Sequence, residues 1–362
     1  MRILHLDSGP SWRGGQQQLY FLIGGLKKEG IQQYLAARKG SALAARVAKL
    51  EVPVRELSLS SELDPISLLG LARLISRFQP ELIHAHDSRT LGLAVLLKTF
   101  GWGGEVVGAR RVEFSIRSNP WWKFKYARRT SRVIAVSHYV RDRLIQEGLE
   151  PCQVEVVYDG VNTLAVPQDK RSSARQLLGM DDTEFLIGCV GYLTPEKGHA
   201  LLIRGFSEIL KIHPDSRLVV VGEGPLREEL EMLILELGLQ GRAVLTGFIS
   251  DLDDVLPGFD LLVHPSLSEG LGSVLLQAMS HHVPLCASRT GGIPEAVVDG
   301  ETGFLFLPGS REALVRSVLR VRSNLGLARQ QVEKGGARVR EAFSVERMVA
   351  DTIRVYAKVL GS

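Results

Sequence analysis

Short apolar runs alternate with longer segments of helical period along the whole chain. A short apolar run bounded by turn residues predicts a buried strand, and its alternation with helical segments predicts parallel βαβ units. In the first half, strands are predicted at 2–6, 33–38, 53–57, 82–85, 105–109, 132–136 and 153–157. In the second half, they are predicted at 185–191, 217–222, 243–247, 261–264, 284–288 and 303–306.

The segments between these strands have the length and period of helices, as at 199–213 and 225–238. Residues 344–360 form one further amphipathic pattern, which predicts a C-terminal helix. The stretch 159–173 is polar and follows neither period, so it is the best candidate for a linker. The pattern therefore predicts two Rossmann-like domains of similar size, joined near residue 165.

Composition narrows the class of protein. The chain has 362 residues, 45% hydrophobic and 23% charged, which is typical of a soluble globular protein with two cores. The net charge of +4 is too small to indicate a nucleic-acid partner. Three scattered cysteines, Cys152, Cys189 and Cys286, favour a reducing compartment.

Two kinds of segment that the sequence does not show, a signal peptide and a membrane-spanning helix, bear on where the protein resides. The first apolar strand breaks at once into glycine and proline, which is unlike a signal peptide. There is also no run of 18 apolar residues, so no membrane-spanning helix is predicted. We expect a cytoplasmic protein, with any membrane contact made at the surface only.

One stretch carries the strongest chemical signal, SLSEGLGSVLLQAM at 266–279. It follows the strand at 261–264, and the helix is predicted to begin near Gly272. The N-terminus of a helix offers free N–H groups and positive potential, which suit a diphosphate. Glu269 would accept hydrogen bonds from sugar hydroxyls, and Gln277 would reach a ribose. An ordinary loop followed by a helix with one polar residue fits the spacing equally well.

The following segment favours the first interpretation. Residues 264–306, with EGLG, TGGIPE and DGETG, closely resemble the retaining GT-B glycosyltransferases of family 4. The resemblance covers nearly the whole chain and is strongest in the second half. Further matching segments are 11–22, 82–87, 131–144, 190–198, 219–230 and 244–256.

The resemblance implies an α/β protein of the GT-B fold, with two Rossmann-like domains that face a central cleft. Residues 1–163 would form the acceptor-side domain and residues 164–344 the nucleotide-sugar-binding domain. The C-terminal helix, 345–362, would pack back onto the first domain. The implied reaction transfers a sugar from a nucleotide-diphosphate donor to a hydroxyl by same-face displacement, with retention of configuration.

The family's motifs assign roles to residues of this sequence. Three residues are implied to be catalytic. Glu269 would contact the transferred sugar, Lys197 would neutralise the leaving diphosphate, and His86 would line the cleft on the acceptor side. The implied donor-binding residues are Gly14, Gly15, Gly191, Tyr192, Phe248, Gly270, Leu271, Gly272 and Gln277. The implied acceptor-side residues are Asp87, Arg111, Trp121 and Trp122.

Three positions depart from the family pattern. Tyr192 stands where the family usually has an arginine, Gln277 where it has a second glutamate, and Arg111 where many members place a histidine. An amide can accept from one ribose hydroxyl and donate to another, so Gln277 is compatible with donor binding. Loss of the arginine removes one of two cations on the leaving group. We interpret the site as modified but working, while an impaired binding protein, a phosphorylase and an epimerase stay open.

Two patterns raise the question of a metal. HAHD at 84–87 places two histidines on one side of a strand end, but the sequence signals no third ligand. A metal, a cleft-lining role and a structural role all stay open for these histidines. DLDD at 251–254 resembles a metal-binding Asp-x-Asp, but acids that open a short helix serve as caps. We expect no metal and no cofactor other than the nucleotide-sugar co-substrate.

The segment 109–132 combines eight basic residues with Trp121, Trp122, Phe124 and Tyr126. Such a mixture favours an anionic membrane surface or a lipid-linked acceptor, whereas a surface helix with inward tryptophans explains it equally well. We expect a glycan or glycolipid acceptor of the cell envelope, such as lipopolysaccharide core, and no nucleic acid.

A nicotinamide-dependent oxidoreductase is disfavoured, because neither half has a Gly-x-Gly-x-x-Gly turn followed by an acid.

Overall fold

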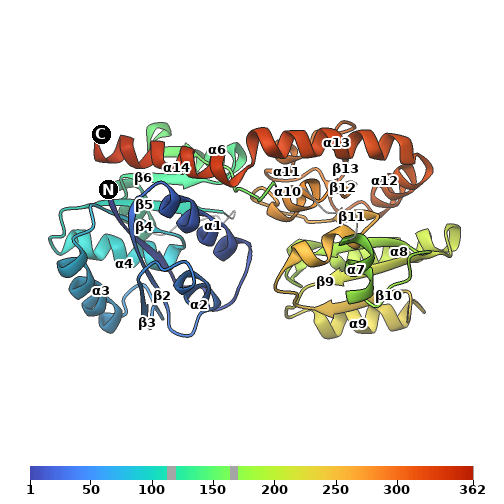
Figure 1. Ribbon diagram of the computed structural model, residues 1–362, viewed down its shortest axis with the longest axis horizontal. Coiled ribbons are helices and arrows are strands. Elements are labelled where there is room, and N and C mark those ends of the chain that lie inside the picture. Colours follow the sequence, from blue (N-terminus) through green and yellow to red (C-terminus); the bar gives the residue numbers. More distant parts are fainter. Residues whose placement is uncertain (112–119, 164–169, 362) are drawn as a thin grey trace. The chain divides into compact units, whose positions relative to one another are not determined.

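The computed structural model describes residues 1–111, 120–163 and 170–361, which form two compact α/β units (Figure 1). Unit 1 is Met1–Gly160 together with Val345–Ser362, and unit 2 is Val161–Ser344. The structure thus divides the chain between 160 and 161, where the sequence places the boundary between 163 and 164. The C-terminal helix belongs to unit 1.

Unit 1 is built on a parallel sheet of seven strands among the described residues, in the order β3-β2-β1-β4-β5-β6-β7. The strands are β1 (Arg2–Asp7), β2 (Gln32–Arg38), β3 (Val54–Leu57), β4 (Leu82–Ala85), β5 (Glu105–Arg110), β6 (Arg132–Ala135) and β7 (Val154–Val156). The helices are α1 (Gly14–Lys28), α2 (Ala42–Ala48), α3 (Pro65–Phe78), α4 (Ser88–Thr99), α5 (Pro120–Lys123), η1 (Phe124–Arg128), α6 (His138–Gln146), η2 (Pro151–Gln153) and α14 (Val345–Leu360).

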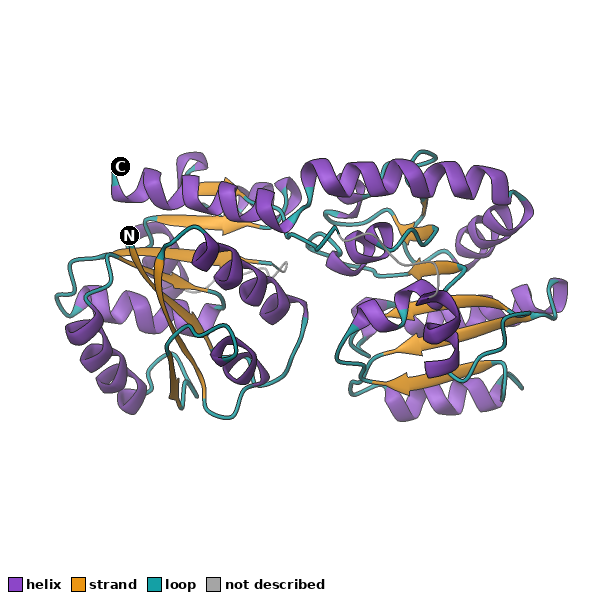
Figure 2. Ribbon diagram, viewed as in Figure 1, coloured by secondary structure: helices purple, strands orange, loops and turns teal. Residues whose placement is uncertain are grey.

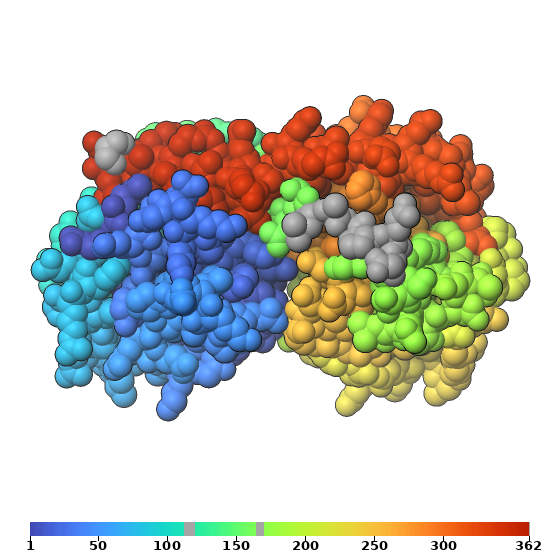
Figure 3. Space-filling view, viewed as in Figure 1, coloured from blue at the N-terminus to red at the C-terminus, as the bar shows by residue number. Residues whose placement is uncertain are grey.

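Helices cover both faces of this sheet (Figure 2). On one face, Leu22 of α1 and Met348 of α14 pack in a single core with Ile3 of β1. The surface of α14 accordingly lies beside that of the N-terminal elements, red against blue in Figure 3. On the other face, Gly108 of β5 lies against Leu91 of α4. The central strands β1, β4 and β5 are therefore buried on both sides, whereas the edge strand β3 has two exposed residues.

Unit 2 has a parallel sheet of six strands among its described residues, in the order β10-β9-β8-β11-β12-β13. The strands are β8 (Phe185–Val190), β9 (Ser216–Val221), β10 (Ala243–Gly247), β11 (Leu261–His264), β12 (Leu285–Ser288) and β13 (Phe304–Phe306). The helices are α7 (Lys170–Leu177), η3 (Pro195–Lys197), α8 (His199–Ile212), α9 (Arg227–Glu236), η4 (Leu252–Asp254), η5 (Leu256–Gly258), α10 (Ser273–Ser280), α11 (Ile293–Ala296), α12 (Arg311–Ser323) and α13 (Leu325–Ala342).

The strands predicted from the apolar runs all appear, with ends that differ by at most one residue. The helices predicted at 199–213, 225–238 and 344–360 correspond to α8, α9 and α14. The predicted linker, 159–173, contains 164–169, which lie outside the described residues.

In each sheet the strand order reverses direction at one place, between β1 and β4 in unit 1 and between β8 and β11 in unit 2. At such a switch point the connections leave to opposite sides, so the carboxyl ends of the two strands border a crevice where ligands bind. The loops after β1, β4, β8 and β11 are therefore the places to search for a site.

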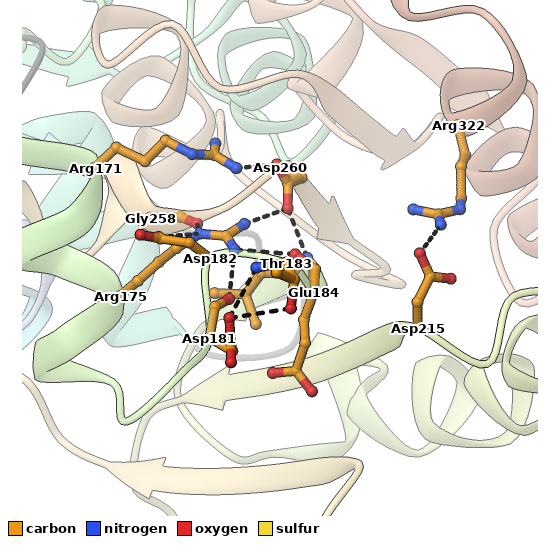
Figure 4. A network of polar contacts seen from close by, with 11 residues as sticks. Arg171, Arg175, Asp181, Asp182, Thr183, Glu184, Asp215, Gly258, Asp260 and Arg322 are labelled. Atoms are coloured by element: carbon orange, nitrogen blue, oxygen red, sulfur yellow. Dashed lines mark hydrogen bonds and ion pairs between the residues drawn. The ribbon is translucent and has the colours of Figure 1, made fainter.

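A buried arginine, Arg175, holds together the segments that precede β8 and β11 of unit 2 (Figure 4). Arg175 of α7 is 1% exposed and pairs with Asp260, which precedes β11. Its other N–H groups donate to the carbonyls of Asp181, Glu184 and Gly258, at 2.7, 2.9 and 3.1 Å. One side chain thereby joins the segments 181–184 and 258–260, so its removal leaves three carbonyls without this donor and takes one of two arginines from Asp260.

Arg175→Leu is expected to destabilise unit 2 by about 3–5 kcal/mol, the usual effect of breaking a buried ion pair. Chemical denaturation followed by circular dichroism measures this loss. Arg171→Leu is the matched control, because Arg171 also pairs with Asp260 but its side chain is 47% exposed. The control should change stability by less than about 1 kcal/mol. Equal effects of the two substitutions would contradict the structural role of Arg175.

Candidate functional site

A compact polar cluster stands at the switch point of unit 2. Lys197 ends the turn η3 after β8, and its Nζ lies 2.5 Å from Oε2 of Glu269 in the loop after β11. His264, the last residue of β11, donates from Nε2 to the same oxygen at 3.0 Å. Ser266 Oγ lies 3.0 Å from His264 Nε2 and 3.4 Å from Glu269 Oε2. The structure thus brings together the two catalytic residues predicted for this half.

Glu269 is held in its ionised form. Burial by itself would raise the pKa of this carboxyl, but the hydrogen bond from His264 and the charge of Lys197 outweigh it and lower the pKa to about 2. Its side chain is only 14% exposed. The carboxylate can therefore only accept hydrogen bonds at neutral pH, which suits a partner that donates, such as a sugar hydroxyl.

Two glycines allow the loops to approach this closely. Gly291, in the TGGIPE turn, has φ of 55°, and a Cβ there would lie 1.8 Å from the backbone oxygen of Glu269. The N–H of Gly292 donates to that same oxygen at 3.1 Å. Gly198 has φ of 69°, and a Cβ there would lie 2.2 Å from the carbonyl oxygen of Pro265. Only glycine fits either position, so these turns set the place of Glu269 and Lys197.

The glycine-rich loop leads directly into α10, as the sequence predicts. Gly272 caps the helix with φ of 89°, and the helix begins at Ser273. The first N–H groups of any helix lack intrahelical acceptors, so the amides near Gly270 and Gly272 stand at the positive end of α10. Leu271 is 2% exposed, so its side chain belongs to the core. Gln277 lies on α10 and is 4% exposed.

The other predicted donor-side residues follow β8 and β10. Gly191 comes directly after β8, and a Cβ there would lie 3.6 Å from the His199 ring. The Tyr192 side chain is exposed, and its carbonyl accepts from His199 Nε2 at 3.3 Å. Phe248 follows β10 and is 53% exposed, so its ring is not a core residue.

Sequence reasoning missed two members of this cluster, His264 and Ser266. A signal for His264 was visible, because this histidine ends a predicted four-residue apolar strand, and ligands of parallel sheets bind at the carboxyl ends of the strands. Only the fold shows that the imidazole of His264 turns toward Glu269.

Unit 1 carries a second polar cluster at its own switch point. The register of β1 and β4 pairs His5 with His84, and His86 follows β4. All three side chains are buried, and one ring nitrogen of each lies within 4.8 Å of the others. The third histidine that the HAHD pattern lacks is therefore His5, which is far away in sequence and adjacent in the sheet.

Other residues predicted for this half have structural partners. The Asp87 side chain accepts from the N–H of Thr90 and of Ser8, so it caps α4 and ties this helix to the loop after β1. Arg111 Nε lies 3.3 Å from Oδ1 of Asp159. Gly14 and Gly15 open α1, and a Cβ on Gly15 would lie 3.9 Å from Cδ of Arg111.

The expectation for the tryptophans needs a correction. Trp122 is 3% exposed and packs on Tyr126, with ring centroids 5.0 Å apart, so its indole lies in the core of unit 1 and not on its surface. Trp121 donates from Nε1 to Glu62 at 2.5 Å. Part of this basic-aromatic segment, 112–119, lies outside the described residues.

The capping interpretation of DLDD is confirmed, because the side chain of Asp251 accepts from the N–H of Asp253 at the start of η4. Asp253 itself lies 2.7 Å from Nε2 of His281.

In the described part of the chain, no helix has both the length and the apolar character needed to cross a bilayer.

A buried acid near the cluster of unit 1 makes stability depend on pH. Asp7 ends β1, is 2% exposed, and accepts from the N–H of Gly9 and from Gln16 Nε2. Burial, followed by the charge of Asp87, raises the pKa of Asp7 from 3.8 to about 7. The folded state therefore keeps a proton that the unfolded chain releases above about pH 4, and stability falls as the pH rises from there to about 7.

Asp7→Asn should remove this part of the pH dependence, because the amide does not titrate. The variant should gain stability relative to the wild type between pH 4 and pH 8. Thermal unfolding of both proteins across this range measures the difference. Parallel curves for the two proteins would show that Asp7 titrates normally.

Comparisons with known proteins bear on the family and the fold. Residues 12–164 match the model described as Glycosyltransferase Family 4, and residues 170–338 match that described as Glycosyl transferases group 1. An uncharacterized glycosyltransferase of Methanocaldococcus jannaschii is 30% identical over 232 residues, which are 62% of this chain and 59% of that protein. A GDP-mannose-dependent alpha-(1-6)-phosphatidylinositol monomannoside mannosyltransferase of Mycolicibacterium smegmatis is 29% identical over 320 residues, covering 76% of this chain and 81% of that protein.

Among solved structures, Anabaena HepE in complex with UDP-glucose is similar over 99% of this chain and 100% of its own, with a TM-score of 0.88 and 22% identity. This likeness establishes the GT-B fold. Since the two family models together match residues in both units, the chain belongs to glycosyltransferase family 4.

Proposed function

We propose that this protein is a retaining glycosyltransferase that moves a sugar from a nucleotide-diphosphate donor to a hydroxyl acceptor. The observation that carries the proposal is the ionised Glu269, held by Lys197 and His264 at the carboxyl edge of β8 and β11. In this proposal, binding of the donor separates Lys197 from Glu269, and each side chain then contacts a part of the donor instead. The diphosphate takes Lys197, the transferred sugar donates its hydroxyls to Glu269, and the amides at the start of α10 contact the phosphates.

The low pKa of Glu269 supports a same-face displacement. Without donor, the pKa of Glu269 is about 2. The hydrogen bond from His264, which remains when the diphosphate takes Lys197, still favours the carboxylate over the acid that would form if Glu269 took the proton of the acceptor hydroxyl. We propose that a phosphate oxygen of the leaving diphosphate takes it. The acceptor oxygen then bonds to the anomeric carbon while the bond from that carbon to the diphosphate oxygen breaks. Lys197 supplies positive charge to the leaving group, so the proposed reaction uses no metal and no further cofactor.

A panel of UDP-, GDP- and ADP-sugars tests the proposal. One donor should raise the unfolding temperature and should be consumed once a hydroxyl acceptor is present. Binding with no turnover of any donor would favour an impaired binding protein, in line with Tyr192 and Gln277. Release of sugar-1-phosphate with added phosphate would favour a phosphorylase, and conversion of the nucleotide sugar alone would favour an epimerase.

Glu269→Ala should lower the transfer rate at least about a hundredfold, the effect expected when a group that stabilises the transition state is removed. The fold should persist, as judged by circular dichroism. Glu196→Ala is the matched control, because Glu196 is an exposed acid of the same turn as Lys197. Near wild-type transfer by Glu269→Ala would remove the central assignment.

We further propose a cell-envelope glycolipid or lipopolysaccharide core as the acceptor, used at the inner face of the cytoplasmic membrane. The mycobacterial relative is named for a phosphatidylinositol mannoside acceptor, which supports a lipid-linked substrate. Since Trp122 is buried, the support from this chain is the set of exposed cations that remains near it, Lys123, Arg128 and Arg129.

Replacing Lys123, Arg128 and Arg129 together by glutamine should weaken binding to anionic lipid vesicles, because each cation near such a surface contributes about 1 kcal/mol. Vesicle sedimentation measures this binding, and neutral phosphatidylcholine vesicles serve as the control. Equal binding of wild type and variant to anionic vesicles would exclude this surface as the membrane contact.

A further inference from the structure

The histidine cluster of unit 1 is a directed chain of hydrogen bonds. His5, His86 and Gln33 lie on the face of the sheet that α1 covers, and all three side chains are buried. Gln33 Nε2 donates to the carbonyl of Ile23 in α1 at 3.0 Å. A carbonyl can only accept, so this contact fixes the orientation of the Gln33 amide.

With the amide fixed, its oxygen faces Nε2 of His5 at 3.2 Å. An amide oxygen only accepts, so His5 must carry its proton on Nε2. Burial lowers the pKa of His5 to about 4, so the ring is neutral and its Nδ1 has a lone pair.

The lone pair of His5 then determines the state of His86. His5 Nδ1 lies 3.1 Å from Nε2 of His86, which must therefore be the donor. Burial first, and then the electrostatic effect of the neighbouring His84, His5 and Arg111, keeps the pKa of His86 well below its ordinary value. His86 is thus neutral with a bare Nδ1. Among the described residues, this buried atom has no hydrogen-bond partner.

We propose that Gln33 and His5 are positioning residues that hold His86 in one tautomer, so that its Nδ1 accepts a hydrogen bond from a hydroxyl of the acceptor substrate. This assignment rests on the proposed function. His86 stands directly before the cap of α4 at the switch point of unit 1, where ligands of parallel sheets bind. An unpaired buried acceptor destabilises the folded state until a donor reaches it, which is the state expected of a binding atom awaiting its ligand.

The same contacts disfavour a metal at this cluster. Both ring nitrogens of His5 already take part in hydrogen bonds, to His86 and to Gln33. A metal bound to His5 would have to displace one of them. The charge of Arg111 also acts on His84 and His86 and would repel a cation.

Nitrogen-15 NMR of the histidine side chains in the full-length protein tests the inference without any assay of activity. His5 and His86 should both be neutral at pH 7 and carry their protons on Nε2. A proton on Nδ1 of His86, a charged His86, or stoichiometric zinc in the purified protein would each overturn it. A protein with these tautomers but no transferase activity would refute the proposed function and leave the hydrogen-bond chain intact.

Gln33→Met keeps the size of the side chain and removes the fixed acceptor. His86 should then show a mixture of tautomers, and kcat for transfer should fall several-fold while KM for the donor stays unchanged. Tyr356→Phe is the matched control, because the Tyr356 hydroxyl lies 2.6 Å from Nδ1 of the neighbouring His84 and makes no hydrogen bond to His5, His86 or Gln33. The control should retain the wild-type signals of His86 and the wild-type kcat. An unchanged His86 tautomer in Gln33→Met would refute the positioning role.

Discussion

The site of unit 2 depends on one buried charge, the carboxylate of Glu269. Burial favours its neutral form, and two proton donors from different loops reverse that preference. Lys197 after β8 and His264 at the end of β11 meet on the same oxygen. This arrangement exists only because β8 and β11 are neighbours in the sheet while their connections diverge. Strand order therefore determines the protonation state of the residue on which the proposed chemistry rests.

Backbone geometry then makes the arrangement rigid. Gly291 lets the TGGIPE turn press against the backbone oxygen of Glu269, and Gly198 lets the turn after Lys197 press against Pro265. These contacts are between main-chain atoms, so they do not depend on side-chain rotamers. The glycines of the family signature thus position two charged side chains, in addition to any amide that they offer to phosphate.

The two units have polar clusters at the same place in their sheets, but the chemistry of the two clusters differs. Each places a cluster of polar side chains at its switch point, but the cluster of unit 2 is ionic and that of unit 1 consists of neutral imidazoles. An ionic cluster suits a diphosphate and hydroxyl groups, whereas neutral rings offer single lone pairs in fixed directions. This difference matches the division into a donor-side and an acceptor-side unit that the family resemblance implies.

The sequence by itself determined the strands and the parallel βαβ organisation, and its family motifs placed Lys197 and Glu269 in one site. It could do so because these features follow from local periodicity and from short motifs. Only the tertiary structure placed His5 beside His84. It also brought His264 into contact with Glu269, and it buried Trp122 in the core. Such contacts join residues from separate strands and helices, and whether a side chain meets solvent, core or a charged partner is decided by packing, which no local pattern encodes.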